Sequence, residues 1–352
     1  MLENGIALYK QKKYQEAGRC IYDAINSEHL KLSVHPRARY WYGKCSYKLA
    51  KLNNTGNSLR YLKNALECFE SAIQQSNRDV DEPPFYYMKG KTLFYLRKFQ
   101  ESLKCFDKLL EINEKDASYN FMKGKVLFEI ESERIVIDRA EKELKIVDAI
   151  FFFRRAIKYE PNVSKYHSAE GEAFFEIKKY KLALLSFEEA IKIDRNDSRY
   201  HFMKARALFL NDQLNAAIKS FNNAIFFNPE IANYHFGKGR ALFRKKRIDA
   251  ALECFKDAIS LNDNDSDFHY YKGKALLEIH KLEDSIKCFN DAISLNGRIA
   301  LYHYFKGRAL FDSERFDDSI ECFDKAISLN DRVNQENYKK VRKTAVEKLK
   351  KR

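Results

Sequence analysis

Apolar residues recur along the chain with the period of an amphipathic helix. In EDSIKCFNDAISL (283–295), Ile286, Phe289 and Ile293 follow an i, i+3, i+7 spacing, and strict alternation of apolar and polar residues is absent. That spacing places the three side chains on one helical face, whereas a half-buried strand would alternate. Similar segments follow one another along the chain, so we predict an all-α fold.

The helical pattern is itself repeated. FHYYKGKALLEIHKLEDSIKCFNDAISLN (268–296) is followed by the similar YHYFKGRALFDSERFDDSIECFDKAISLN (302–330). One slot of the repeat holds eight of the twelve glycines and one alanine: Gly5, Gly43, Gly90, Gly124, Gly171, Ala205, Gly239, Gly273 and Gly307. Most steps between these positions have the same length as the step from Gly273 to Gly307, and three steps are longer. Repetition at a period of about 34 residues is typical of a solenoid.

Each unit is predicted to contain two helices, such as YYKGKALLEI and EDSIKCFNDAISL. Proline lacks an N–H and belongs between helices or in a first turn. All five prolines fall between a second helix and the next first helix: Pro36, Pro83, Pro84, Pro161 and Pro229. We therefore predict about nine helix–turn–helix units in residues 1–333, with helical insertions near 50–64 and 130–148. Such insertions often serve binding, but simple drift in length explains them as well.

The last segment, NQENYKKVRKTAVEKLKKR (334–352), differs from the repeats. Tyr338, Val341, Ala345 and Leu349 form one apolar stripe, and eight Lys or Arg face two Glu. A terminal helix that covers the last repeat needs one apolar face and a charged outer face. We predict a basic capping helix, which supplies six of the fourteen net positive charges of the chain.

The units resemble the tetratricopeptide repeat, a helix–turn–helix of about 34 residues. Counting from the glycine slot, the matching positions are a small residue twelve later (Ala183, Ala217, Ala251, Ser285, Ser319), Phe four after that (Phe187, Phe221, Phe255, Phe289, Phe323) and Ala three further on (Ala190, Ala224, Ala258, Ala292, Ala326). The usual Trp four places before the glycine is His or another residue here. The resemblance implies an α-solenoid superhelix whose first helices line a concave, ligand-binding groove.

One pattern on the first helices indicates binding. The residue after the glycine slot is Lys or Arg in seven units, with Glu172 as an exception. In these seven units an aromatic residue stands four before that position, and another stands three after it except at Leu277. This spacing places all three on one helical face. The candidate groove residues are Lys91, Lys125, Arg206, Arg240, Lys274, Arg308, Phe202, Phe236, Tyr270, Tyr304, Phe209, Phe243 and Phe311. A competing interpretation is that the aromatic residues pack between repeats and the cations only aid solubility.

These features favour a non-enzymatic scaffold that binds an acidic, extended or helical segment of another protein. A subunit of a larger assembly, such as a ciliary or cytoskeletal one, is a special case of this hypothesis. We favour the run 206–308, where the basic positions are unbroken. The alternative is binding of single-stranded RNA, because aromatic rings can stack on bases and cations can meet phosphates. The chaperone-binding members of the family carry Asn after the glycine, and no unit here does, so that role is not expected.

Other classes of function find little support. The net charge of +14 and pI of about 9.2 favour anionic partners. No P-loop, G-x-S-x-G, H-E-x-x-H or dinucleotide motif occurs, so we expect no enzyme, cofactor, metal or small-molecule substrate. Six of the seven cysteines share one repeat slot and are expected to be free thiols, and five histidines at the repeat spacing are expected to pack on helix faces. With no signal peptide or apolar span, a cytoplasmic location is expected, with the cilium or cytoskeleton as special cases and no membrane partner.

Overall fold

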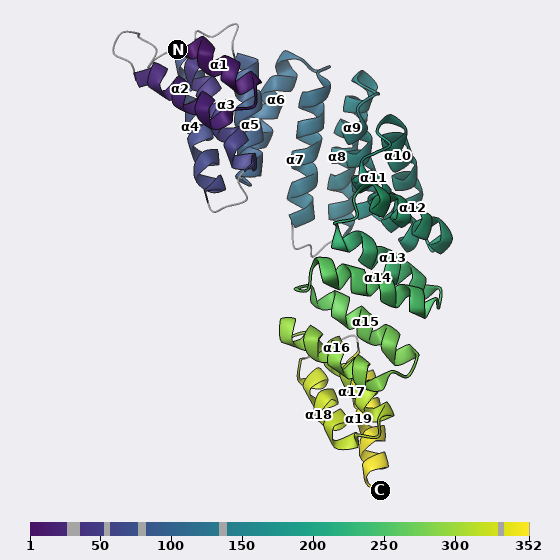
Figure 1. Cartoon of the computed structure of the whole chain (residues 1–352). Coiled ribbons are helices and arrows are strands. Elements are labelled where there is room, and N and C mark those ends of the chain that lie inside the picture. Colours follow the sequence, from purple (N-terminus) through teal and green to yellow (C-terminus); the bar gives the residue numbers. More distant parts are fainter. Residues whose placement is uncertain (27–35, 53–56, 77–81, 134–138, 330–333, 352) are drawn as a thin grey trace. The chain divides into compact units, whose positions relative to one another are not determined.

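The computed structural model of the chain describes residues 1–26, 36–52, 57–76, 82–133, 139–329 and 334–351. Every secondary-structure element among these residues is an α-helix, which confirms the predicted all-α fold (Figure 1). The helices are α1 (Leu2–Lys10), α2 (Tyr14–Asn26), α3 (Pro36–Leu52), α4 (Ser58–Gln75), α5 (Glu82–Tyr95), α6 (Phe99–Ile112), α7 (Ala117–Glu133), α8 (Arg139–Tyr159), α9 (Ser164–Glu176), α10 (Tyr180–Ile193), α11 (Ser198–Leu210), α12 (Leu214–Phe227), α13 (Ala232–Arg244), α14 (Ile248–Leu261), α15 (Ser266–Glu278), α16 (Leu282–Leu295), α17 (Ala300–Asp312), α18 (Phe316–Ser328) and α19 (Gln335–Leu349).

The chain forms two compact units, which we call unit 1 (Met1–Lys179) and unit 2 (Tyr180–Arg352). Unit 1 contains α1–α9, with packed pairs α1/α2, α3/α4, α5/α6 and α7/α8. Unit 2 contains α10–α19, with packed pairs α11/α12, α13/α14, α15/α16 and α17/α18. Within each unit, every second helix packs on the next first helix, and first helices of neighbouring pairs also touch. This confirms the predicted α-solenoid. We call α1, α3, α5, α7 and α9 the first-helix row of unit 1, and α11, α13, α15 and α17 that of unit 2.

The glycine slot lies where the two helices of a pair cross. A Cβ atom at Gly273 would stand 2.8 Å from Cε1 of Phe289, and one at Gly307 would stand 2.8 Å from Cε1 of Phe323. Both Phe side chains are fully buried. Across the same crossing, Ser285 Oγ donates a hydrogen bond of 2.9 Å to the carbonyl oxygen of Gly273. The spacing of glycine, small residue and Phe in the sequence therefore reflects one close helix–helix contact.

The turn between the helices of a pair uses left-handed backbone without glycine. Seven residues have φ between 57° and 64°: Lys12, Arg97, Lys178, Asp212, Lys246, His280 and Glu314. In one such turn, the N–H of Lys281 donates a hydrogen bond of 3.0 Å to the carbonyl oxygen of Leu276 and closes the end of α15. Left-handed backbone is unfavourable for a residue that carries a Cβ atom, so each turn holds a small amount of strain.

The five recurring histidines form hydrogen bonds to the short loop, here called the joint, between one helix pair and the next. In each case Nε2 lies 2.8–3.0 Å from a backbone carbonyl oxygen six residues earlier. The five contacts are His167–Pro161, His201–Arg195, His235–Pro229, His269–Asp263 and His303–Gly297. The sequence predicted packing of these rings on helix faces. The hydrogen bond adds a partner for a carbonyl group that lies outside the helices.

The two predicted insertions correspond in part to longer helices. Around the first, α3 has 17 residues and α4 has 18. Around the second, α7 has 17 and α8 has 21. The helices of the four pairs in unit 2 have 13 or 14 residues. The middle of each insertion, 53–56 and 134–138, lies outside the described residues.

Helix α19 packs on α18 and covers the last pair of unit 2. Tyr338 and Ala345 are buried in that contact, with 1% and 0% exposure, and Val341 and Leu349 are half-buried. The predicted apolar stripe is therefore the packing face, and a capping helix is confirmed. The predicted boundary between residues 333 and 334 adjoins 330–333, which lie outside the described residues.

Candidate functional site

The basic residues after the glycine slot, which we call the basic rungs, lie against aromatic rings. Arg240 on α13 provides the fullest case. Its Cζ atom lies 5.6 Å from the ring centroid of Phe236 on the same helix and 5.1 Å from that of Phe209 on α11. A third ring, Tyr271 of α15, lies at 5.1 Å. Cations at such distances from ring faces are attracted to the π electrons, so the guanidinium group is held in place by three helices.

The other basic rungs of unit 2 differ in the number of aromatic rings that they contact, and no contact with a described ring is found for Arg308. Lys274 Nζ lies 5.4 Å from the Tyr270 ring of its own helix and 5.7 Å from the Phe243 ring of the preceding first helix. Arg206 Cζ lies 5.7 Å from the Phe202 ring. Arg308 is exposed.

Unit 1 shows the same arrangement with lysine. Lys91 Nζ lies 5.1 Å from the ring centroid of Tyr87 on its own helix and 5.6 Å from that of Tyr47 on α3. Lys125 Nζ lies 5.1 Å from the Phe94 ring of α5. The spacing read from the sequence thus corresponds to a real pattern, in which a cation on one first helix contacts rings on its own helix, on the preceding one or on both.

The aromatic rings serve mainly as packing between repeats. The ring of Phe202 lies 4.8 Å from that of Tyr234, and the ring of Phe236 lies 4.7 Å from that of Phe268. Phe209, Tyr270 and Tyr304 are 7–9% exposed, and Phe202, Phe236, Phe243 and Phe311 are half-buried. The competing interpretation therefore holds for much of the aromatic set: these rings hold the array together and shape the setting of the cations.

Three of the lysines directly before the glycine slot make contacts that differ from those of the basic rungs. The residue before the slot forms an ion pair with the preceding second helix in three cases: Lys89–Glu70 (3.0 Å), Lys123–Asp107 (2.6 Å) and Lys204–Glu188 (2.8 Å). No ion pair with a described carboxylate is formed by six of the basic rungs: Lys44, Lys91, Lys125, Arg240, Lys274 and Arg308. At Gly90 and Gly124 the two flanking cations thus have different environments, and only the one before the slot has a described carboxylate partner. At Gly239, Gly273 and Gly307 neither flanking cation forms an ion pair with a described carboxylate.

Burial and mutual repulsion affect the charge of the lysine rungs. Burial lowers the pKa of Lys91 from its usual value of 10.5 to about 8, and Lys51 and Lys165 add to the effect. Burial also lowers the pKa of Lys274, opposed by Glu278, while Arg240 is one of the cations that lower it further. Burial disfavours the charged form of an amine, and like charges act in the same direction. Both sites would gain from a nearby anion.

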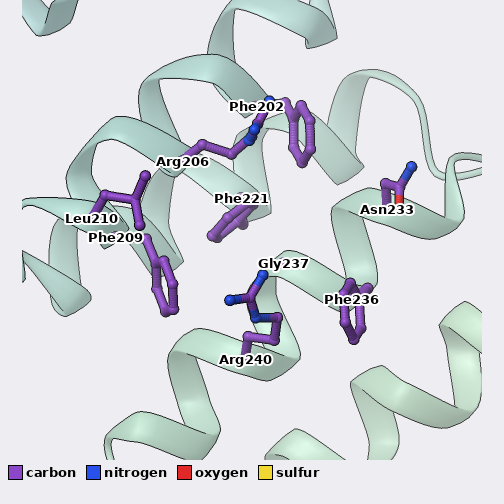
Figure 2. Close-up of a pocket in the computed structure, with 9 residues that line it drawn as sticks. All are labelled: Phe202, Arg206, Phe209, Leu210, Phe221, Asn233, Phe236, Gly237 and Arg240. Carbon is purple, nitrogen blue, oxygen red and sulfur yellow. The ribbon is translucent and has the colours of Figure 1, made fainter. Parts of the chain in front are cut away.

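A pocket of about 500 Å³ opens on the first-helix row of unit 2. Its lining residues are Phe202, Arg206, Phe209, Leu210, Phe221, Asn233, Phe236, Gly237 and Arg240. In Figure 2 the Phe221 ring of α12 lies between Arg206 of α11 and Arg240 of α13. Five of these nine residues belong to the predicted site, and Phe221 and Gly237 were not predicted as part of it.

Metal and thiol chemistry find no support in the described part of the chain. No group of three or more His, Cys, Asp or Glu there could hold a metal ion. All seven cysteines, each within the described ranges, are free thiols. Burial raises the pKa of Cys68 and Cys105 to about 11, so these thiols stay protonated at neutral pH. None of the helices described is both long and apolar enough to cross a membrane.

Comparison with known proteins supports the family. Models described as the tetratricopeptide repeat match residues 83–116, 202–267 and 300–332. A tetratricopeptide repeat protein from Parabacteroides merdae is 14% identical with a TM-score of 0.52, covering 75% of this chain and 99% of that one. MamA from Desulfovibrio magneticus is 21% identical (TM-score 0.46; 52% and 97%). YrrB, described as having an unusual peptide-binding site, is 19% identical (TM-score 0.46; 53% and 97%). Curated protein sequences gave no match.

The family models match segments in both units. In, between and before those segments, the same crossing of glycine on Phe recurs at Gly43, Gly90, Gly124, Gly239, Gly273 and Gly307. Helices cover nearly all of the described residues and pack in consecutive pairs. This chain is a tetratricopeptide repeat protein.

Proposed function

We propose that this chain is a non-enzymatic scaffold that binds an acidic segment of a partner protein along its first-helix rows. Tetratricopeptide repeat proteins are generally scaffolds for protein–protein interaction. The observation that carries the proposal is the row of cations after the glycine slot. Most of them lie against aromatic rings, and six have no carboxylate partner among the described residues.

The chemistry of these cations suits carboxylates. A guanidinium group held against rings, as Arg240 is, loses little freedom when it binds a carboxylate with two parallel hydrogen bonds. A buried ammonium group such as Lys91 gains more from an anion than an exposed one does, because water competes less. Rungs in successive repeats offer several such contacts to one extended or helical segment.

Burial of the aromatic rings weighs against RNA as the partner. A base stacks on a ring whose face is open to solvent. Phe209, Tyr270 and Tyr304 have exposures of only 7–9%, and their faces are used between repeats. RNA therefore serves as a comparison ligand in the experiment.

The test compares two charge-matched variants of the full chain. In the rung variant Arg206, Arg240, Lys274 and Arg308 are all changed to Gln. In the control variant the lysines before the slot, Lys204, Lys238, Lys272 and Lys306, are changed to Gln, which removes the same charge from the same helices. Binding of a fluorescein-labelled oligoglutamate peptide is followed by fluorescence anisotropy at low and at physiological salt.

We expect the rung variant to lose at least about tenfold in affinity, since several charged contacts are removed, and the control variant to lose less than about twofold. Equal losses in the two variants would mean that net charge alone attracts the peptide. Absence of binding to the unmodified chain would refute the proposal outright. An oligouridylate of equal length that binds more tightly than the peptide, and depends on the same rungs, would point to RNA instead.

A further inference from the structure

The packing at the glycine slot departs from the repeat pattern at α11 and α13, and the departure involves two positions. Ala205 stands in the glycine slot of α11. One repeat later, Gly237 stands two residues before the slot, where the other repeats carry a larger residue. The equivalents are Glu3, Trp41, Met88, Met122, Ala169, Met203, Tyr271 and Phe305. Both changes concern the same ring, because Ala205 and Phe221 share one buried cluster and a Cβ atom at position 237 would meet the Phe221 ring.

The two exceptions compensate each other sterically. In a regular pair the Phe ring fits against a glycine, as Phe289 does against Gly273. Ala205 brings a methyl group to that side, so the ring of Phe221 needs room elsewhere. Gly237 provides it: a Cβ atom at this position would stand 2.4 Å from Cε1 of Phe221. Real Cβ atoms do not approach so closely, so a side chain at position 237 requires the ring to move.

The glycine removes the side chain that lies beside the equivalent ring in the next repeats, although Phe221 itself is only 2% exposed. In the next repeat the ring of Tyr271 lies 6.1 Å from that of Phe255, and in the one after it Phe305 lies 6.1 Å from Phe289. No side chain from position 237 covers Phe221, and the pocket of about 500 Å³ lies there. Its volume falls in the range of roughly 300–1,000 Å³ that is typical of ligand pockets.

The polar groups of the pocket are cationic. The Nε atom of Arg240 is buried and has no hydrogen-bond partner among the described residues. A buried donor of this kind is costly unless an acceptor reaches it. Arg206 lies on the opposite side of the Phe221 ring in Figure 2 and is exposed. The pocket therefore combines an apolar lining, in which Leu210 is exposed and Phe202 and Phe236 are half-buried, with two guanidinium groups at its sides.

We infer that this pocket binds one large apolar side chain of the partner segment, with an adjacent carboxylate paired to Arg240 and Arg206. The inference rests on the proposed function, because the same acidic segment supplies both groups. Charge complementarity identifies the occupant: an apolar side chain without a neighbouring anion would leave the buried donor of Arg240 unsatisfied. The pocket is then the anchor that fixes which part of a long acidic segment sits on α11 and α13.

The experiment uses three labelled peptides of equal length. The first alternates Glu and Ser around a central Phe, the second has Ala in place of that Phe, and the third keeps Phe but has Ser in place of every Glu. We expect the unmodified chain to bind the first about tenfold more tightly than the second, because burial of a Phe side chain outweighs the cost of fixing it. The third peptide should bind weakly.

The matched variant fills the pocket in the way the neighbouring repeat does. Ala205→Gly combined with Gly237→Tyr recreates around Phe221 the arrangement of Gly239, Phe255 and Tyr271. This variant should bind the first and second peptides alike, with the affinity that the unmodified chain has for the second. Phe305→Tyr, at the equivalent position one repeat later that is already filled, is the control and should keep the tenfold preference. Thermal unfolding followed by circular dichroism verifies that each variant is folded.

The outcomes separate this inference from the proposed function. A filled variant that still prefers the Phe peptide overturns the inference and leaves the scaffold proposal intact. Failure of the unmodified chain to bind either acidic peptide overturns both. Equal binding of the first and third peptides overturns the role of the carboxylate. If the filled variant does not fold, a peptide with a photoreactive benzoylphenylalanine at its centre gives the answer: the inference requires cross-links to Phe209, Leu210 or Asn233, and cross-links confined to other helices refute it.

Discussion

Unit 1 and unit 2 place a cation at the same point of the repeat but use different chemical groups. In unit 1 the rungs are Lys44, Lys91 and Lys125, whereas three of the four rungs in unit 2 are arginines. An ammonium group that is buried releases its proton more easily, and burial lowers the pKa of Lys91 to about 8. A guanidinium group stays charged throughout the accessible pH range. Two units with one architecture should therefore respond differently to pH.

The difference also concerns stability. At neutral pH the ammonium group of Lys91 is charged in a partly desolvated environment, which lowers the free energy of unfolding. Arg240 lies among three rings, and its more weakly hydrated group loses less on burial. Lys91 therefore carries a charge that destabilises the fold and has no carboxylate within the described chain to offset it. A carboxylate supplied by a bound protein would offset that cost.

The largest effect is expected for Lys91→Met. Removing a charge that burial disfavours should raise the free energy of unfolding at pH 7 by about 2 kcal/mol, given about 1.36 kcal/mol per pKa unit less the lost cation–π contact. The folded-state pKa lies below the unfolded one, so the penalty is complete below about pH 8 and disappears as pH rises toward 10.5. The gain should thus shrink at about pH 9. Urea denaturation at the two pH values measures it.

The matched change in unit 2 is Arg240→Met. It should give no gain in the free energy of unfolding at either pH, because the contacts of the side chain with three rings are lost. If the two variants behaved alike, the distinction between lysine and arginine rungs would carry no energetic meaning.

A somewhat smaller effect is expected for binding. In the chain whose unit 2 rungs are changed to Gln, the remaining affinity for oligoglutamate reports on unit 1. With a pKa of about 8, only about a tenth of Lys91 is charged at about pH 9. Affinity should therefore fall by up to about tenfold between about pH 7 and about pH 9. Burial also lowers the pKa of Lys44, another rung of unit 1. Adding Lys91→Arg to this background should therefore reduce the fall, and a fall of the same size with arginine present would exclude Lys91 as its cause.

The smallest effect concerns a feature that the two units share. Lys12 in unit 1 and His280 in unit 2 have left-handed backbone, with φ of 64° and 57°. Glycine adopts this conformation without strain, so Lys12→Gly and His280→Gly should each raise the free energy of unfolding by about 0.5–1 kcal/mol. Thermal unfolding of each variant measures the gain. A loss in either unit would show that the side chain, and not the backbone, decides the stability of that turn.

The sequence predicted the features that rest on regular spacing. The helix pairs, the crossing of glycine on Phe and the positions of the basic rungs all recur with the period of the repeat, so one repeat helps to interpret the next. The capping helix followed from one apolar stripe in a basic segment. What these rungs bind stays a prediction, because the spacing places cations and says nothing of their partner.

Features that depend on exceptions or on backbone geometry were not predicted. Gly237 falls outside the glycine slot, and only the Cβ position relative to Phe221 shows why a glycine is needed there. The left-handed turns were not predicted because glycine, their usual marker, is absent. The histidine contacts are made to carbonyl groups, which every residue carries, so no pattern of side chains reveals the acceptor.

The histidine contact has a consequence for how such a chain can change its length. Donor ring and acceptor carbonyl lie six residues apart, so each repeat brings both halves of its own joint. The acceptor can be Pro161, Arg195, Asp263 or Gly297 without loss, since only the main chain takes part. Duplication or deletion of one whole repeat therefore leaves every remaining joint intact. The coding sequence of one repeat can therefore be duplicated as a whole. Substitutions at single positions, such as 205 and 237, can follow after the duplication.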